Sequence, residues 1–169
     1  EPLLRRALEG RRALLGETHP STLVAMNNLA TSLVPQKKLD EAQRLMTFVY
    51  EQNLKDQGEE HPKTLVAQGV LAFIAEERGD SEGAERLYLR AIEIRKRIKG
   101  GTDPETWPSM NNLATLYVRW GRLEDAEKLF REVIDLTTRA LPPEHPFTAI
   151  FRSNFGECLT KQGKREEAE

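Results

Sequence analysis

A fixed repeat period of 42 residues constrains the fold of this chain more than any other feature of its sequence. A proline recurs with that step, and so does a threonine two residues after it, at Pro20 and Thr22, Pro62 and Thr64, Pro104 and Thr106, and Pro146 and Thr148. A period of this length is typical of a stacked array, in which each unit buries its apolar face only against its neighbours. We therefore expect one elongated array of about four units. Such arrays usually bind other molecules rather than transform them.

The composition narrows the class of partner. The 169 residues are 38% hydrophobic and 31% charged, and 25 basic against 27 acidic residues give a formal net charge of −2. We expect no nucleic acid partner, because phosphate binding needs a net basic stripe. We also expect no membrane partner, since no apolar run approaches the ~20 residues that span a bilayer. The single cysteine, Cys158, excludes an internal disulfide and any multi-cysteine metal site. It fits a reducing compartment, and we expect a cytoplasmic protein.

Each unit has the pattern of two helices. The first begins at the His-Pro or Asp-Pro step, where proline suits the first turn and the preceding residue can cap the helix. Pro35 is expected to end or kink the first helix of its unit early. A lysine pair or a glycine then indicates a break, followed by a second helix of about 18 residues, or roughly 27 Å. In the first unit the apolar positions follow the helical period, as Met26, Leu29, Ala30 and Leu33 and then Leu39, Ala42, Leu45 and Val49. The predicted fold class is all-α.

The register of the repeat sets the expected boundaries within a single array of residues 1–169. Residues 1–15 match the second helix of a preceding repeat, residues 16–57, 58–99 and 100–141 form three repeats, and residues 142–169 form part of a fourth. Gly100-Gly101 is expected to be linker, without the spacing of a phosphate-binding loop. Both ends fall within a repeat, so we expect the sequence to come from a longer array. We also consider end-to-end self-association of the incomplete repeats.

The histidines have a structural explanation. His19, His61 and His145 share one phase of the repeat, and Asp103 holds that phase in the remaining unit. An exchange of histidine with aspartate before proline fits a capping role. Copies in adjacent units lie two helix layers apart, roughly 16–20 Å, whereas the ligands of one metal lie about 2 Å from it. The histidines therefore cannot form one metal site.

The other candidates for chemistry are also explained by helix structure. Cys158 shares its phase with Ser32, Ile74 and Leu116. That phase tolerates apolar residues, which favours a packed thiol over a nucleophile. The acidic pairs Asp40-Glu41, Glu124-Asp125 and Glu166-Glu167 stand at the starts of second helices. Carboxylates there complement the helix dipole. We predict no catalytic residue, no metal and no cofactor.

Two segments resemble a known repeat family. Residues 110–117, Met-Asn-Asn-Leu-Ala-Thr-Leu-Tyr, and residues 121–130, Gly-Arg-Leu-Glu-Asp-Ala-Glu-Lys-Leu-Phe, have the order and spacing of a tetratricopeptide repeat. The 42-residue period, with a Gly-x-x-His-Pro-x-Thr linker before Asn-Asn-Leu-Ala, resembles the kinesin light chain subclass of that family. The resemblance implies an α-solenoid of antiparallel helix pairs in a right-handed superhelix. It also implies that the first helices line a concave groove, which captures an extended peptide or a partner helix.

The asparagines are the one positive signal for binding. Asn28, Asn112 and Asn154 recur in one phase, although asparagine costs about 0.7 kcal/mol relative to alanine within a helix. A carboxamide can donate to a peptide carbonyl and accept from a peptide N–H. The alternative is that these asparagines pair with neighbouring helices and only hold the array together. The groove positions that the resemblance implies are Val24, Asn28 and Thr31, then Val66, Phe73 and Glu77, then Asn112, Thr115 and Arg119, and finally Asn154, Glu157 and Lys161.

These positions lead to a functional hypothesis with one rival. The leading hypothesis is a non-catalytic protein–protein interaction scaffold that binds a peptide or helix in the groove. The asparagines would clamp the backbone, and Val66, Phe73 and Arg119 would set the preference, with no strong selection for acidic or basic ligands. The rival is a regulatory sensor or an oligomerisation solenoid attached to a signalling enzyme or a nucleotide-binding switch in a larger protein. An enzyme in its own right is the interpretation that the residues favour least.

Overall fold

The structure, a computed structural model, describes residues 1–99, 103–142 and 145–164. All regular elements of these residues are helical, which confirms the predicted all-α class. They are α1 (Pro2–Leu15), α2 (Pro20–Leu33), α3 (Leu39–Gln57), α4 (Pro62–Glu77), α5 (Ser81–Lys99), the 3-10 helix η1 (Pro104–Thr106), α6 (Trp107–Arg119), α7 (Leu123–Ala140) and α8 (Pro146–Lys161). The chain forms two compact units, Glu1–Leu87 and Tyr88–Glu169, and the boundary between them lies inside α5.

The residue before each repeat proline caps a helix, as predicted. In three repeats a histidine Nδ1 accepts a hydrogen bond from the backbone N–H two residues later, and in the third repeat the Asp103 carboxylate does the same. The bonds run from Ser21 to His19 at 3.1 Å, from Lys63 to His61 at 3.2 Å, from Phe147 to His145 at 3.2 Å and from Glu105 to Asp103 at 3.3 Å. Because each side chain is committed to its own helix, the shared phase of the histidines reflects capping.

The repeated threonine closes the turn that precedes the first helix. Thr22 and Thr64 are fully buried, and their hydroxyls donate to the carbonyls of Gly16 and Gly58, each at 2.8 Å. In the first two repeats the motif is therefore a turn-and-cap unit, in which the side chains satisfy backbone groups that a helix start leaves unpaired. The equivalent hydroxyls of Thr106 and Thr148 are buried without a hydrogen-bond partner among the described residues.

The third repeat begins differently from the others. Its Pro104–Thr106 segment is a 3-10 helix, and the α-helical part starts at Trp107. The expectation that every first helix begins at the repeat proline is therefore wrong for this repeat. The cause is Pro108, which has no N–H to donate to the carbonyl four residues earlier, so the α-helical bond pattern cannot start at Pro104.

The first helices end at the predicted breaks. Gly79, Gly121 and Gly163 occupy one phase of the repeat and have φ values of 81°, 73° and 81°. Lys37 holds the same phase with φ 59°, so a side-chain-bearing residue adopts a left-handed conformation there. α2 ends at Leu33, two residues before Pro35, which confirms the predicted early stop.

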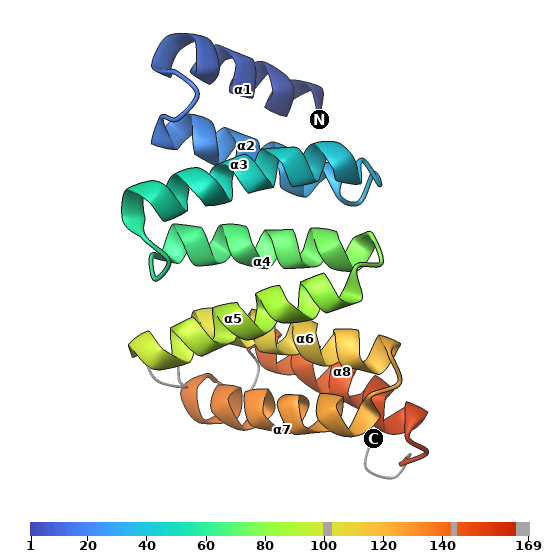
Figure 1. Ribbon diagram of the computed structural model, residues 1–169. Coiled ribbons are helices and arrows are strands. Elements are labelled where there is room, and N and C mark those ends of the chain that lie inside the picture. Colours follow the sequence, from blue (N-terminus) through green and yellow to red (C-terminus); the bar gives the residue numbers. More distant parts are fainter. Residues whose placement is uncertain (100–102, 143–144, 165–169) are drawn as a thin grey trace. The chain divides into compact units, whose positions relative to one another are not determined.

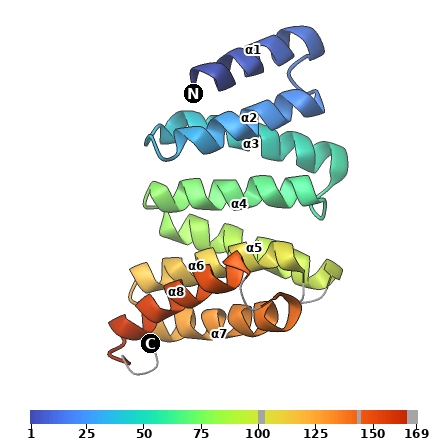
Figure 2. The same cartoon turned by 180° about the vertical axis from the view of Figure 1, so that it is seen from behind.

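The first unit is a stack of neighbouring helices, shown in Figure 1 and from behind in Figure 2. α1 packs against α2, α2 against α3 and α3 against α4. The predicted stripe of Met26, Leu29, Ala30 and Leu33 is fully buried, together with Met46 of α3. Between α1 and α3, the two terminal guanidinium nitrogens of Arg5 donate to the Glu41 carboxylate, at 2.6 and 2.7 Å.

The second unit packs around larger side chains. α6 contacts η1, α7 and α8, and α7 contacts α8. Trp107, Met110 and Leu113 of α6 and Phe130 of α7 are fully buried. The Glu127 carboxylate accepts from Lys164 at 2.8 Å, and the pair Glu1 and Lys38, 126 residues earlier in the sequence, makes the same contact in the first unit at 2.6 Å.

Some sequence-based expectations concern residues outside those described. They are the Gly100-Gly101 linker, the acidic pair Glu166-Glu167 and the last five residues of the partial fourth repeat. The pairs Asp40-Glu41 and Glu124-Asp125 do lie in the first turns of α3 and α7, as predicted.

Candidate functional site

The exposed faces of α2 and α4 carry the predicted groove positions of the first unit. Val24 and Val66 are each 48% exposed, and Phe73 is 41% exposed. Asn28 and Thr31 are also exposed on α2, at steps of four and seven residues from Val24, so the three side chains share one helix face. On α4 the same spacing joins Val66 to Phe73. Large apolar side chains thus face solvent beside an amide and a hydroxyl.

An apolar pocket of about 260 Å³ lies at the amino-terminal end of these faces. Its walls come from the amino-terminal parts of α2 and α4 and the carboxyl-terminal half of α3. The lining residues are Thr18, Pro20, Leu23, Val24, Asn27, Val49, Asn53, Asp56, Gln57, Pro62, Lys63 and Val66. Two predicted groove residues, Val24 and Val66, therefore line a pocket. Phe73, which is expected to help set the ligand preference, is not part of its wall.

The second unit presents the remaining predicted positions on α6 and α8. Arg119 and Glu157 are exposed, as is Lys161, and Asn112, Thr115 and Asn154 are half-buried. The Thr115 hydroxyl donates to the Asn111 carbonyl of its own helix at 3.0 Å. Thr31 makes the equivalent bond in the first unit, to the carbonyl four residues earlier, at 2.9 Å. Both hydroxyls are thus engaged as donors and retain only acceptor capacity.

The three recurring asparagines differ in their contacts. The Asn154 amide nitrogen donates to the side-chain oxygen of buried Asn111 on α6, at 3.0 Å. This bond joins α8 to α6, as the helix-pairing alternative requires. Among the described residues, the side chains of Asn28 and Asn112 have no hydrogen-bond partner. These two amides therefore keep their full capacity to donate to and accept from a ligand backbone.

The predicted charged positions are compensated locally. Glu77 pairs with Lys37, and Lys161 pairs with Glu157 one helical turn earlier at 2.8 Å. Exposed ion pairs of this kind contribute little to stability. They do reduce the net charge of each face, which favours a ligand that carries no large net charge.

Sequence reasoning missed Ile150 of α8, which is 50% exposed. It lies 126 residues after Val24 and 84 after Val66, so the repeat step alone would have identified it. It also missed Val49 and Asn53, which line the pocket from a second helix. No simple pattern signals these two, because a second-helix residue reaches this face only through the way α3 packs between α2 and α4.

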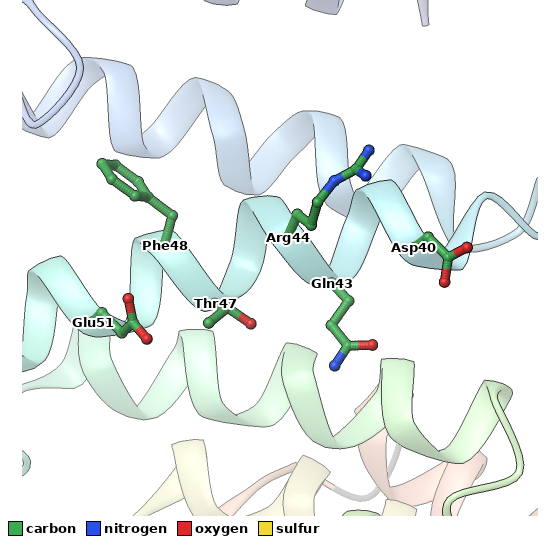
Figure 3. A pocket seen from close by; sticks show the side chains of 6 residues that line it. All are labelled: Asp40, Gln43, Arg44, Thr47, Phe48 and Glu51. Carbon is green, nitrogen blue, oxygen red and sulfur yellow. The ribbon is translucent and has the colours of Figure 1, made fainter.

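A wider depression of about 430 Å³ lies over α3. Figure 3 shows its lining residues along that helix: Asp40, Gln43, Arg44, Thr47, Phe48 and Glu51. All six come from one face of one helix, so they do not converge on a ligand from several sides. The Arg78 guanidinium, and more weakly that of Arg44, lowers the pKa of the Asp40 carboxyl. A charged and solvated helix face explains these features.

Cys158 is a packed thiol. It is fully buried on α8, and its sulfur lies 3.6 Å from the Leu123 carbonyl oxygen. Burial raises the pKa of the thiol, and the nearby Glu127 carboxylate adds to that effect. A raised pKa reduces the thiolate fraction and hence the reactivity of a cysteine.

In residues 1–99, 103–142 and 145–164, no three histidine, cysteine or acidic side chains are grouped as metal ligands would be. No helix in this part of the chain combines the length and hydropathy of a membrane span.

Comparison with known families identifies the repeat. Family models described as tetratricopeptide repeat match residues 26–97, 64–139 and 108–169, and another with the same description matches residues 1–21. The chain belongs to the tetratricopeptide repeat family. A search of curated protein sequences gave no significant match.

Solved structures of other tetratricopeptide repeat proteins share the fold. Two crystal structures of nearly identical TPR-like repeats, from a Podosopora anserina protein assigned as a kinesin light chain, are each 25% identical to this chain. One, of a single-residue variant, has a TM-score of 0.78, and the other 0.76; both alignments cover 99% of this chain and 79% of the other. BtubC (BKLC) from P. vanneervenii is 20% identical, with a TM-score of 0.81 over 99% of this chain and 66% of its own. The chain is therefore an all-α tetratricopeptide solenoid of the kinesin light chain-like type.

Proposed function

We propose that this tetratricopeptide array is a non-catalytic interaction module that binds an extended peptide or a partner helix along the exposed faces of its first helices. Proteins of this family generally serve as scaffolds for other proteins. We further propose that the protein acts in the cytoplasm and that its partner is neither nucleic acid nor membrane. The described residues offer no observation that favours the alternative of a regulatory sensor or oligomerisation solenoid.

One observation carries the proposal. Val24 and Asn28 share one exposed face of α2, Val66 and Phe73 share one exposed face of α4, and Val24 and Val66 line the same pocket. The amide of Asn28 has no partner among the described residues. Exposed apolar groups gain free energy when a ligand covers them, at about 25 cal/mol per Å². An amide beside them can satisfy the peptide groups that the same ligand would otherwise bury unpaired.

The roles of the individual residues follow from their surroundings. Asn28 and Asn112 clamp the ligand backbone, since both amides are available. Asn154 contributes less, because part of its hydrogen-bonding capacity is used by Asn111. Val66 and Phe73 provide apolar contacts in the first unit, and Arg119 provides a charge in the second.

A peptide selection tests this function. A random peptide library is selected against the whole chain, and the affinities of the recovered peptides are measured by calorimetry. Replacing both amides, Asn28→Ala with Asn112→Ala, should weaken binding about fivefold or more, the equivalent of about 1 kcal/mol for a lost hydrogen bond. Gln43→Ala on α3 is the matched control, because it removes an exposed amide from a different helix face. Equal affinities for the wild type, the double variant and the control would contradict the clamp, and a selection that recovers no peptide would contradict the function.

The same variants separate clamping from helix pairing. Asn154→Ala should lower the free energy of unfolding by about 1 kcal/mol, because it leaves the buried Asn111 oxygen unpaired. Asn28→Ala should not destabilise the chain, since its amide has no described partner and alanine is the better helix former. Urea unfolding followed by circular dichroism measures both.

A further inference from the structure

The first helices of the repeats hold equivalent places, but α4 buries fewer large apolar side chains than α2 or α6. All of α4 is described, and of its large apolar residues only Leu65 and Ile74 are buried. The buried large apolar residues of α2 are Leu23, Met26, Leu29 and Leu33, and those of α6 are Trp107, Met110, Leu113, Leu116, Tyr117 and Val118. Because tertiary burial supplies most of the stability of a helix in a protein, α4 is the least anchored of the three.

Polar residues hold two of the core positions of α4. Gln68 is buried where the first and third repeats bury Met26 and Met110. Its amide nitrogen donates to the Leu87 carbonyl at 3.1 Å, so the amide is paired within the core. Glu76 is also buried, at a position where the first and third repeats have a valine. A paired polar group in a core exchanges bonds to water for bonds to protein, so its burial stabilises the fold less than that of an apolar side chain.

Two small residues weaken α4 further. Ala75 is half-buried where Leu33 and Tyr117 are buried, so this position contributes one methyl group in place of a large side chain. Gly69 lies in the middle of the helix, where glycine has a lower helix propensity than any residue except proline. A Cβ at Gly69 would meet no atom within 4 Å, so no close approach of a neighbouring helix requires glycine there. Ile74, where the first repeat has a serine, offsets only part of these losses.

This weakly anchored helix carries apolar side chains of the proposed binding face. Val66 and Phe73 are both exposed on α4. They lie seven residues apart, so both face the same side only while the two turns between them are helical. A ligand that covers both side chains therefore binds only the folded state of α4, and it stabilises that state by mass action.

We propose that α4 opens locally in the free chain more often than α2 or α6, and that a ligand on Val66 and Phe73 holds it closed. Segments with few buried apolar contacts are those that open at low free energy. A repeat array permits such opening, because each helix is stabilised only by its immediate neighbours. The control by ligand rests on the peptide-binding function above and names the element whose stability that binding changes.

Amide hydrogen exchange of the whole chain, read by mass spectrometry, measures the opening. Without ligand, the slowest amides of α4 should be about tenfold or more less protected than those of α2 and α6, because replacing even one buried leucine by alanine shifts an equilibrium by more than that. Equal protection of α4, α2 and α6 would overturn the proposal.

Two variants test whether the sequence of α4 causes the opening. Gly69→Ala adds a methyl group in open space and should raise the protection of α4 about fivefold, the equivalent of about 1 kcal/mol of helix propensity. Gln68→Met restores the residue of the first and third repeats and should also raise it. Gly10→Ala is the matched control, because Gly10 lies within α1 and a Cβ there also meets nothing within 4 Å. The control should leave α4 unchanged, and no gain in α4 from either test variant would overturn the proposal.

A peptide selected against the whole chain tests the control by ligand. At a free concentration about thirty times its dissociation constant, the peptide should raise the protection of α4 about thirtyfold. The protection of α1, which carries none of the proposed contacts, should stay the same and serves as the internal control.

The outcomes separate this inference from the proposed function. A peptide that binds without slowing exchange in α4 overturns the control by ligand while peptide binding stands. If no peptide is recovered, the proposed function fails and the control by ligand fails with it. The measurement on the free chain still decides by itself whether α4 opens.

Discussion

Replacing Arg95 by methionine should destabilise the second unit by about 3 kcal/mol, through the loss of a buried charge pair. Arg95 of α5 is 5% exposed, and one of its guanidinium nitrogens lies 2.6 Å from Glu105 and 3.7 Å from Asp103. Asp103 is itself 6% exposed and caps η1. Its other nearby cation is Lys99, at 3.8 Å.

The size of each loss in stability depends on which charged groups the substitution leaves buried without a partner. Methionine retains most of the apolar stem of Arg95, so the cost is mainly electrostatic. It leaves the Asp103 carboxylate buried with Lys99 and one backbone N–H, and removing one partner of a buried pair costs about 3–5 kcal/mol. Asp103→Asn should cost about 1–2 kcal/mol, because asparagine still caps the helix while Arg95 keeps Glu105. The double variant buries no unpaired charge, so it should be about 2 kcal/mol more stable than the sum of the single effects predicts.

The assay uses the positions of the two tryptophans. Trp107 and Trp120 are the only tryptophans of the chain, and both lie in the second unit. Their fluorescence therefore reports urea unfolding of that unit, while circular dichroism reports all helices. The distinction matters because repeat arrays need not unfold in one step. Arg90→Met is the control on the same helix, since its pair with Glu93 is exposed and should contribute less than about 1 kcal/mol.

Additivity would refute the reasoning. If the two single effects sum to that of the double variant within about 0.5 kcal/mol, Arg95 and Asp103 are not energetically coupled. A cost for Arg95→Met no larger than that for Arg90→Met would show that burial does not strengthen this pair.

Three further predictions concern the helix ends and pH. His61→Ala should cost about 1 kcal/mol through the lost cap, whereas His61→Asp should not, because aspartate does the same work in the third repeat; circular dichroism in urea compares them. Lys37→Gly should raise the free energy of unfolding by about 0.5 kcal/mol. The relief of left-handed backbone strain is larger than the combined cost of glycine's backbone entropy and of the lost exposed ion pair. Lys37→Ala, which keeps the strain, should show no gain in melting temperature. Hydrogen bonds from Lys164 and then Arg131 lower the pKa of Glu127 to about 2 from 4.5. The lowered value means that this stabilisation is complete above pH 4.5 and is lost as the pH falls toward 2. Glu127→Gln should therefore cost about 1 kcal/mol at pH 7, with much of the pKa shift screened by solvent, and the difference from the wild type should vanish near pH 2.

Features set by local spacing could be predicted from the sequence. The caps at His61 and Asp103, the early end of α2 before Pro35 and the burial of the Met26 stripe all depend on residues within a turn or two of one another. The 3-10 start of the third repeat could also be predicted, because Pro108 has no N–H for an α-helical bond to the Pro104 carbonyl. The repeat pattern alone does not indicate it, because Pro108 has no counterpart at the equivalent positions Val24, Val66 and Ile150.

Features set by packing could not be predicted in this way. The bond between Asn154 and Asn111 joins residues 43 apart and depends on the placement of two side chains on different helices. The pocket has the same origin, since Val49 and Asn53 reach it from α3. The division of the chain inside α5 has no signal in the composition of that helix. The twelve predicted groove residues remain a prediction, and their tests are the binding measurements above.

Residues that are shared by all copies of the repeat have a different role from residues that differ between the copies. Prolines and capping residues recur because every unit must begin its first helix in the same way, so they carry no information about a ligand. Exchanges at otherwise equivalent positions change what a unit offers. Asn28 and Asn112 offer an amide where the equivalent Val70 offers none. Trp107 fills its place in the core, whereas the equivalent Leu23 lines a pocket. Specificity in this array should therefore lie where the copies disagree.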